Sequence, residues 1–175
     1  GHSHPYIAQA IAEQANKLEH VIFAGFTHEP AIRLAERLLD ILPDNQSKIF
    51  FSDNGSTATE VAIKMAFQYF HNQGIEKKKI IAIDGAYHGD TFGAMSVGDR
   101  GPFTAPFDPY LFEVEFIDFP DADKEDEVWK HFKGLVESGD VASFIFEPIV
   151  QGASGMKFYS AELLDRMIAL AQGHD

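Results

Sequence analysis

Segments with apolar residues at helical spacing alternate along the chain with short, unbroken apolar runs. The helical spacing, with Pro, Ser and acidic residues that favour helix starts, predicts helices over residues 4–18, 27–42, 55–71, 91–97, 121–137 and from 160 to the end of the chain. The apolar runs predict strands at 48–52, 79–84, 113–118 and 141–147, the last being the clearest buried strand. This alternation is typical of an α/β fold with a mostly parallel sheet and helices on both faces.

Polar segments that contain glycine follow three of the predicted strands directly. The sequence Asn54-Gly55-Ser56-Thr57 follows the first strand, and AYHGDTFGAMS at 86–96 follows the second. FEPIVQGASG at 146–155 covers the end of the strand at 141–147. Ligands of open parallel sheets bind outside the carboxyl ends of the strands, so we expect the three segments to meet at one site.

The first segment combines features that suit phosphate. A helix that begins at Gly55, Ser56 and Thr57 offers free backbone amides, the positive end of its dipole and two hydroxyl groups. The lysine of a Walker loop is missing, which argues against binding of a nucleoside triphosphate. An ordinary N-capped helix explains the same residues equally well, so this motif alone does not distinguish a phosphate site from a helix cap.

The other two segments carry candidate ligand-binding side chains. Tyr87 could lay its ring on a flat heteroaromatic ligand and reach a reacting group with its hydroxyl. Glu147 ends an apolar strand and therefore needs a hydrogen-bonding partner, and Gln151 begins a polar loop beside it. His88 and Asp90 could instead be metal ligands of a hydrolase, but no third ligand is evident and we expect no metal site.

Composition and charge narrow the classes of function. The chain has 175 residues, 45% of them hydrophobic, which is enough for about one domain with a real core. A net charge of −13 argues against a nucleic-acid or anionic-membrane surface. No apolar run has the ~18 residues of a membrane helix, and the absence of Cys fits a cytoplasmic location.

The order of these motifs resembles that of the class III, fold-type I, pyridoxal-phosphate-dependent aminotransferases. The resemblance implies a pyridoxal 5'-phosphate site in which the first segment cradles the phosphate, the second stacks on the pyridine ring and the third lies along the cofactor edge. It assigns cofactor contacts to Gly55, Ser56, Thr57, Tyr87, His88, Gly89, Glu147 and Gln151. It also implies that Tyr87 touches the substrate and that the intact protein is a homodimer.

Within the class, FAGFTHEPAIRLAERL, YHGDTFGAMSVGD and FEPIVQGASGM are most similar to members that transfer an amino group from S-adenosylmethionine to 8-amino-7-oxononanoate in biotin biosynthesis. Three kinds of protein remain as alternatives: members acting on ornithine, γ-aminobutyrate or glutamate semialdehyde, a non-catalytic phosphate-binding module, and the metal hydrolase.

The same resemblance places several catalytic parts of the family outside this chain. The Schiff-base lysine, the aspartate that pairs with the pyridine nitrogen and the arginine for the substrate carboxylate are expected beyond Asp175. Further substrate aromatics are expected before Gly1. We therefore expect residues 1–175 to form a partial large domain, truncated at both ends, that carries no catalytic residue and is inactive alone.

Overall fold

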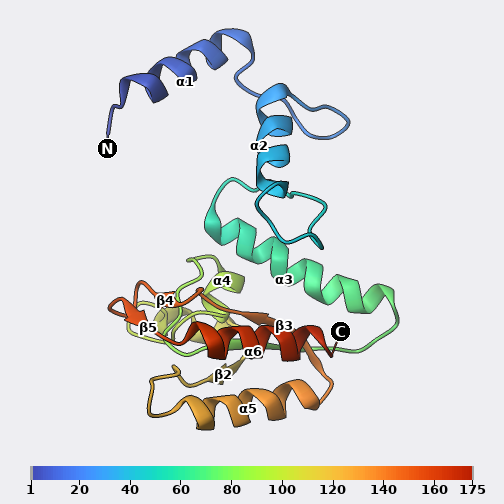
Figure 1. The fold of residues 1–175 in the computed structure, drawn as a ribbon, viewed down its shortest axis with the longest axis vertical. Coiled ribbons are helices and arrows are strands. Elements are labelled where there is room, and N and C mark those ends of the chain that lie inside the picture. Colours follow the sequence, from blue (N-terminus) through green and yellow to red (C-terminus); the bar gives the residue numbers. More distant parts are fainter. Residues whose placement is uncertain (1, 175) are drawn as a thin grey trace. The chain divides into compact units, whose positions relative to one another are not determined.

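The computed structural model describes residues 2–174. Contacts within the chain group these residues into two compact units, 1–51 and 52–175, and each is described by itself (Figure 1). The expectation of one partial domain over residues 1–175 stays a prediction.

The first unit contains α1 (Pro5–Lys17) and α2 (Glu29–Leu39), both with Pro in the first turn as the sequence predicts. Their apolar stripes are largely uncovered within the unit. No residue of α1 is buried, and Ala31 is the buried residue of α2. The helical periodicity therefore predicted these helices correctly, while the burial that such stripes usually indicate is missing.

The predicted strand at 48–52 is wrong. Residues 48–52 have no strand assignment, and Phe50 is 64% exposed. A strand exists only when its backbone groups pair with a neighbouring strand, and no described segment pairs with this one. Its apolar side chains instead line a hollow of about 540 Å³ together with residues of α2, within the first unit.

The second unit is built on a three-stranded parallel sheet of order β2-β1-β3. β1 (Lys79–Ile83) lies between β2 (Glu115–Ile117) and β3 (Val141–Ile145). In the register, Ile81 pairs with Glu115 of β2 and with Phe144 of β3. The predicted strands at 79–84, 113–118 and 141–147 are thus all present, with shorter bounds.

The most buried strand is β1 rather than β3. Ile80, Ile81, Ala82 and Ile83 are at most 1% exposed, whereas Ala142 is the only residue of β3 in the buried class. The expectation that 141–147 is the clearest buried strand is wrong because burial follows from the strand order. An outer strand of the described sheet has a neighbour on one side only.

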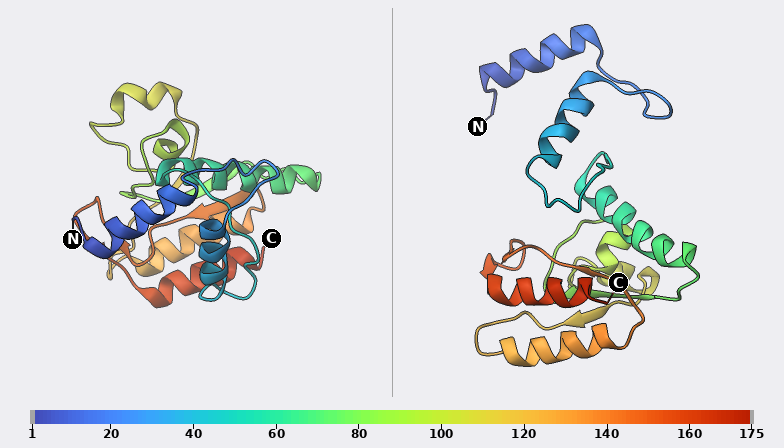
Figure 2. Two further views of the ribbon diagram at one scale, coloured as in Figure 1. Left: turned by 90° about the horizontal axis from the view of Figure 1, so that it is seen from above. Right: turned by 45° about the vertical axis from the view of Figure 1, so that its right-hand side comes forward.

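Helices cover both faces of this sheet (Figures 1 and 2). α3 (Gly55–Asn72) and α4 (Phe92–Ser96) lie on one face, and α5 (Glu125–Glu137) and α6 (Ala161–Gln172) lie on the other. Alternation along β1 divides the core accordingly: one cluster contains Ile80, Ala82, Ile63 and Val97, and the other contains Ile81, Ile83, Phe132, Leu163 and Met167. The predicted helices and the α/β layering are confirmed.

Two small elements were not predicted. β4 (Val150–Gln151) and β5 (Lys157–Phe158) form an antiparallel hairpin on either side of the expected polar loop at 151–155. A 3₁₀ helix, Ala105–Tyr110, lies between α4 and β2, outside every predicted helix and strand. Strands of two residues are too short to show an alternating pattern, which explains why the hairpin was not predicted.

Candidate functional site

The start of α3 is shaped by a reciprocal cap. The Thr57 amide donates to Asn54 Oδ1 at 3.0 Å, and the Asn54 amide donates to Thr57 Oγ1 at 3.3 Å. The Thr57 hydroxyl also donates to Asp53 Oδ1 at 2.6 Å, which lowers the pKa of that exposed carboxyl group. Thr57 is thus occupied as a capping residue, while the amides of Gly55 and Ser56 have no acceptor among residues 2–174.

The turn at 87–90 lies directly against this helix start. The Asp90 amide donates to Ser56 Oγ at 3.1 Å, and Thr59 Oγ1 donates to the His88 carbonyl at 3.0 Å. Gly89 has a φ of +128°, and a Cβ atom there would lie 2.8 Å from Ser56 Cα. Only glycine therefore allows the turn to approach α3 this closely.

Glu147 joins the segment after β1 to the segment after β3. Its Oε1 accepts from the Tyr87 amide at 3.0 Å, and its Oε2 accepts from the Gly152 amide at 3.0 Å. The partners expected for a carboxylate at this strand end are therefore backbone amides. Through Ser56, Asp90, Tyr87 and Glu147, hydrogen bonds link the three segments that the sequence predicted to meet.

The Tyr87 side chain is half exposed, and its hydroxyl points back at Asp90 in the turn at 87–90. Its hydroxyl donates to Asp90 Oδ2 at 2.7 Å, and this hydrogen bond raises the pKa of Tyr87. Tyr87 as a residue is 51% exposed and lines a cavity of about 360 Å³ with Asp90, Phe103 and Ser154. A flat ligand could thus reach the ring without displacing core residues.

His88 and Gln151 are the more deeply placed polar residues of the site. Burial lowers the pKa of His88, the Glu147 charge opposes this in part, and Nε2 has no hydrogen-bond partner among the described residues. Gln151 is fully buried, and its Nε2 donates to the Asp84 carbonyl at 3.1 Å. Gln151 therefore reaches the site from within the protein, and its Oε1 is likewise unpaired in the described part.

The sequence did not single out Glu60, and it placed Ser154 in the polar loop without a role of its own. Glu60, one turn after Ser56 on α3, accepts hydrogen bonds from the segment that follows the Tyr87 turn. Ser154 donates to the Gly85 carbonyl. The spacing of four residues from Ser56 to Glu60 was the available signal, since it places both side chains on one helix face.

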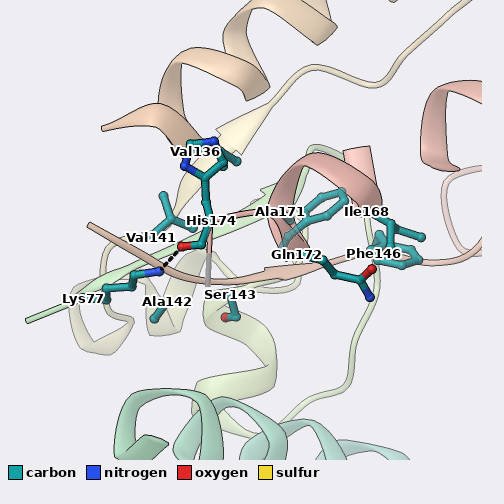
Figure 3. A pocket seen from close by; sticks show the side chains of 11 residues that line it. Lys77, Val136, Val141, Ala142, Ser143, Phe146, Ile168, Ala171, Gln172 and His174 are labelled. Atoms are coloured by element: carbon teal, nitrogen blue, oxygen red, sulfur yellow. Dashed lines mark hydrogen bonds between the residues drawn. The ribbon is translucent and has the colours of Figure 1, made fainter. Parts of the chain in front are cut away.

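Residues 2–174 hold no group of three or more His, Cys, Asp or Glu side chains arranged for a metal ion. Over the same residues, no helix has the length and apolar character needed to cross a membrane. A separate cavity of about 380 Å³ lies along β3 and α6, where Lys77 donates to the His174 carbonyl (Figure 3). None of the predicted site residues lines this cavity.

The family of the chain follows from its similarity to known proteins. The family profile described as "Aminotransferase class-III" matches residues 1–175. The chain belongs to the class III aminotransferase family. The cofactor of this family is pyridoxal phosphate, as the resemblance implied.

Individual members of the class III family match almost the whole chain. An adenosylmethionine-8-amino-7-oxononanoate aminotransferase from Synechococcus elongatus is 52% identical over 98% of the chain, and the match covers 42% of the relative. A protein of the same name from Staphylococcus aureus is 37% identical over 100% of the chain and 42% of its own length.

The structural comparison agrees. The crystal structure of the protein of that name from Methanocaldococcus jannaschii superposes with a TM-score of 0.92 and 36% identity, covering 100% of the chain and 40% of that structure. The predicted fold class is therefore confirmed. The chain spans 42% or less of the length of these relatives.

Proposed function

We propose that this chain is the phosphate- and ring-binding part of a pyridoxal-phosphate-dependent aminotransferase that moves an amino group from S-adenosylmethionine to 8-amino-7-oxononanoate, giving 7,8-diaminononanoate in biotin biosynthesis. The observation that carries the proposal is the hydrogen-bonded meeting of α3, the Tyr87 turn and Glu147. The choice of substrates is supported by the names of the relatives, of which one is 52% identical.

The residues present fit this cofactor. The amides of Gly55 and Ser56, which have no acceptor in the described part, and the start of an 18-residue helix supply donors for a phosphate group. The Ser56 hydroxyl accepts from Asp90, so its own hydrogen remains free to donate. Tyr87 is half exposed and offers a flat apolar face, and its turn is hydrogen-bonded to the helix start through Asp90 and Ser56.

Each group has a distinct role in the proposal. Pyridoxal phosphate supplies an electron sink for charge that develops at the carbon bearing the substrate amino group. Ser56 and the helix start would hold the phosphate and Tyr87 would orient the ring. The Tyr87 hydroxyl, which donates to Asp90, would contact the substrate. Glu147 fixes the position of the Tyr87 backbone by accepting from its amide. Gln151 donates to the Asp84 carbonyl, directly after β1.

Cofactor affinity of the full-length protein tests the proposal. We expect pyridoxal phosphate to bind and to raise the unfolding temperature, since a ligand that binds only the native state stabilises it. Ser56→Ala should weaken the affinity by about tenfold, the value of one hydrogen bond to a charged group. Equal affinity would show that the backbone amides do nearly all of the anchoring.

Substrate assays separate the reactions within the class. With 8-amino-7-oxononanoate as acceptor, we expect S-adenosylmethionine to serve as donor and glutamate not to serve. Tyr87→Phe should retain the bound cofactor but lower turnover or weaken substrate binding, because it removes only the hydroxyl. Unchanged kinetics for both substrates would contradict the role given to that hydroxyl.

A homodimer and a cytoplasmic location belong to the same proposal. The exposed apolar side chains of α1, among them Ile7 and Ile11 at 55% and 64%, support a partner surface. Sedimentation of the full-length protein tests the dimer: a single monomeric species at micromolar concentration would contradict it.

A further inference from the structure

Glu60 makes an unusual set of contacts for a carboxylate in the middle of a helix. Its Oε1 accepts from Thr91 Oγ1 at 2.5 Å, from the Gly93 amide at 2.7 Å and from the Ala94 amide at 3.3 Å. Thr91 is the N-cap residue of α4, yet its own side chain caps no amide. A side chain of α3 therefore does the capping of α4.

Gly93 leaves open the space that the Glu60 carboxylate occupies. Gly93 is buried within α4, and a Cβ atom there would lie 2.7 Å from Glu60 Cδ and 2.8 Å from its Oε1. Its φ is not in the left-handed region, so the nearest obstacle to a larger residue here is the carboxylate at the end of the Glu60 side chain. The close contact at Gly93 is thus made by the Glu60 carboxylate and does not come from an unusual backbone conformation of the turn.

Glu60 is the last in a row of contacts from α3 to one segment. Ser56 accepts from the Asp90 amide, Thr59 donates to the His88 carbonyl, and Glu60 holds the residues that follow. Ser56 and Thr59 each make one hydrogen bond to this segment, whereas Glu60 makes three. A carboxylate suits this place, because hydrogen bonds to an ionised acceptor are roughly twice as strong as neutral ones.

We propose that Glu60 is a positioning residue for the cofactor site. Its hydrogen bonds hold the start of α4, and this fixes the position of the preceding turn so that Tyr87 and Ser56 can contact the same ligand. This inference rests on the proposed function. It predicts that loss of Glu60 weakens ligand binding although Glu60 itself touches no ligand.

The test compares pyridoxal phosphate affinity and unfolding temperature in the full-length protein. Glu60→Ala should weaken affinity by about tenfold to a hundredfold, and Glu60→Gln, which keeps an acceptor of the same length, by about threefold. Gly93→Ala, which forces the same carboxylate away, should resemble Glu60→Ala. The visible circular dichroism of the bound cofactor should fall in the same order, because it reports ring orientation.

Two variants serve as matched controls. Gly134→Ala places a methyl group in open space on α5, and Asp140→Asn alters a carboxylate that pairs with Lys79 at the other end of β1. Both should bind the cofactor within about twofold of wild type. If Glu60→Ala and Glu60→Gln lower the unfolding temperature while their affinity and dichroism match wild type, Glu60 is merely structural and the inference is overturned.

A wild-type protein that fails to bind pyridoxal phosphate would refute the proposed function instead. Hydrogen exchange then decides on Glu60, using the amides of Tyr87 and Asp90, which bond to Glu147 and Ser56. If Glu60→Gln speeds exchange at these two amides, the positioning role holds without any ligand. If faster exchange is confined to Gly93 and Ala94, the inference fails.

Discussion

The two ends of β1 differ in how their loops are held. At the carboxyl end, Ser56 and Glu147 bind backbone amides of other segments, and Gly89 allows a close approach to α3. At the amino end, Lys79 pairs with Asp140 at 3.0 Å and Glu115 at 3.5 Å, with side chains about 40% exposed.

The difference between the two ends of β1 predicts where substitutions destabilise the fold. A side chain that bonds a backbone amide fixes the path of the chain, and its loss leaves a donor unpaired. An exposed ion pair fixes little, since water and salt replace it. We therefore expect substitutions at the carboxyl end to be costly and those at the amino end to be mild.

The largest expected effect is that of Gly89→Ala. The new methyl group must displace Ser56, and the backbone at φ +128° disfavours any side chain, so the free energy of unfolding should fall by about 3 kcal/mol. Denaturant unfolding measures the change. Gly139 is the matched control near the amino end of β3: its φ is +81° with nothing within 4 Å, so Gly139→Ala should cost about 1 kcal/mol. Equal losses at the two glycines would mean that backbone strain, not the contact with Ser56, decides.

Much of this arrangement could be predicted from the sequence because it is local or follows general rules. Helix periodicity located α3, and apolar runs located β1 and β3. The rule that loops meet at the carboxyl ends of parallel strands predicted the meeting of Tyr87 and Glu147. Ser56 joins them through its hydrogen bond to the Asp90 amide, although the strand predicted before it is absent.

Features that depend on neighbours distant in sequence could not be predicted in this way. The apolar run at 48–52 needs a pairing strand, and the central place of β1 follows from the strand order. In the sequence Glu60 looks like an ordinary solvent-exposed residue of a helix. Its spacing from Ser56 places it on the same helix face, but its contact with Gly93 is visible only in the structure. For Thr57, capping and phosphate binding require the same residue type, so the sequence left both open.

The next largest effect should come from Glu147→Ala. The substitution removes the shared acceptor of the Tyr87 and Gly152 amides, and we expect a loss of about 2 kcal/mol in the free energy of unfolding. Glu115→Ala is the control at the amino end, where removal of a half-exposed partner of Lys79 should cost about 0.3 kcal/mol. Similar losses for the two glutamates would remove the distinction between the two ends.

A pH-dependent effect sharpens the comparison further. Burial lowers the pKa of His88 in the folded protein, so below the ordinary value of about 6.5 the unfolded state binds a proton that the folded state does not. Stability should therefore fall as the pH drops from 7.5 through 6.5 towards the lowered pKa. His88→Asn should flatten this part of the profile, measured by denaturant unfolding at each pH. A profile with the same slope in the variant would show that His88 does not contribute to it.

The smallest effect is expected from Lys79→Met, which removes the charge at the amino end but retains most of the apolar stem. Asp140, and to a lesser degree Glu115, raise the pKa of Lys79, yet the pairs are well exposed to water. We expect a loss of about 0.5 kcal/mol at low salt that shrinks further in 1 M NaCl, where the Debye length is only about 3 Å. Unfolding measured at both salt concentrations tests this, with the loss for Glu147→Ala expected to change less because amides of the chain, rather than mobile charges, surround that carboxylate. A loss above about 2 kcal/mol for Lys79→Met that persists in high salt would contradict the comparison, because the amino end would then hold the sheet as firmly as the loops around Ser56 do.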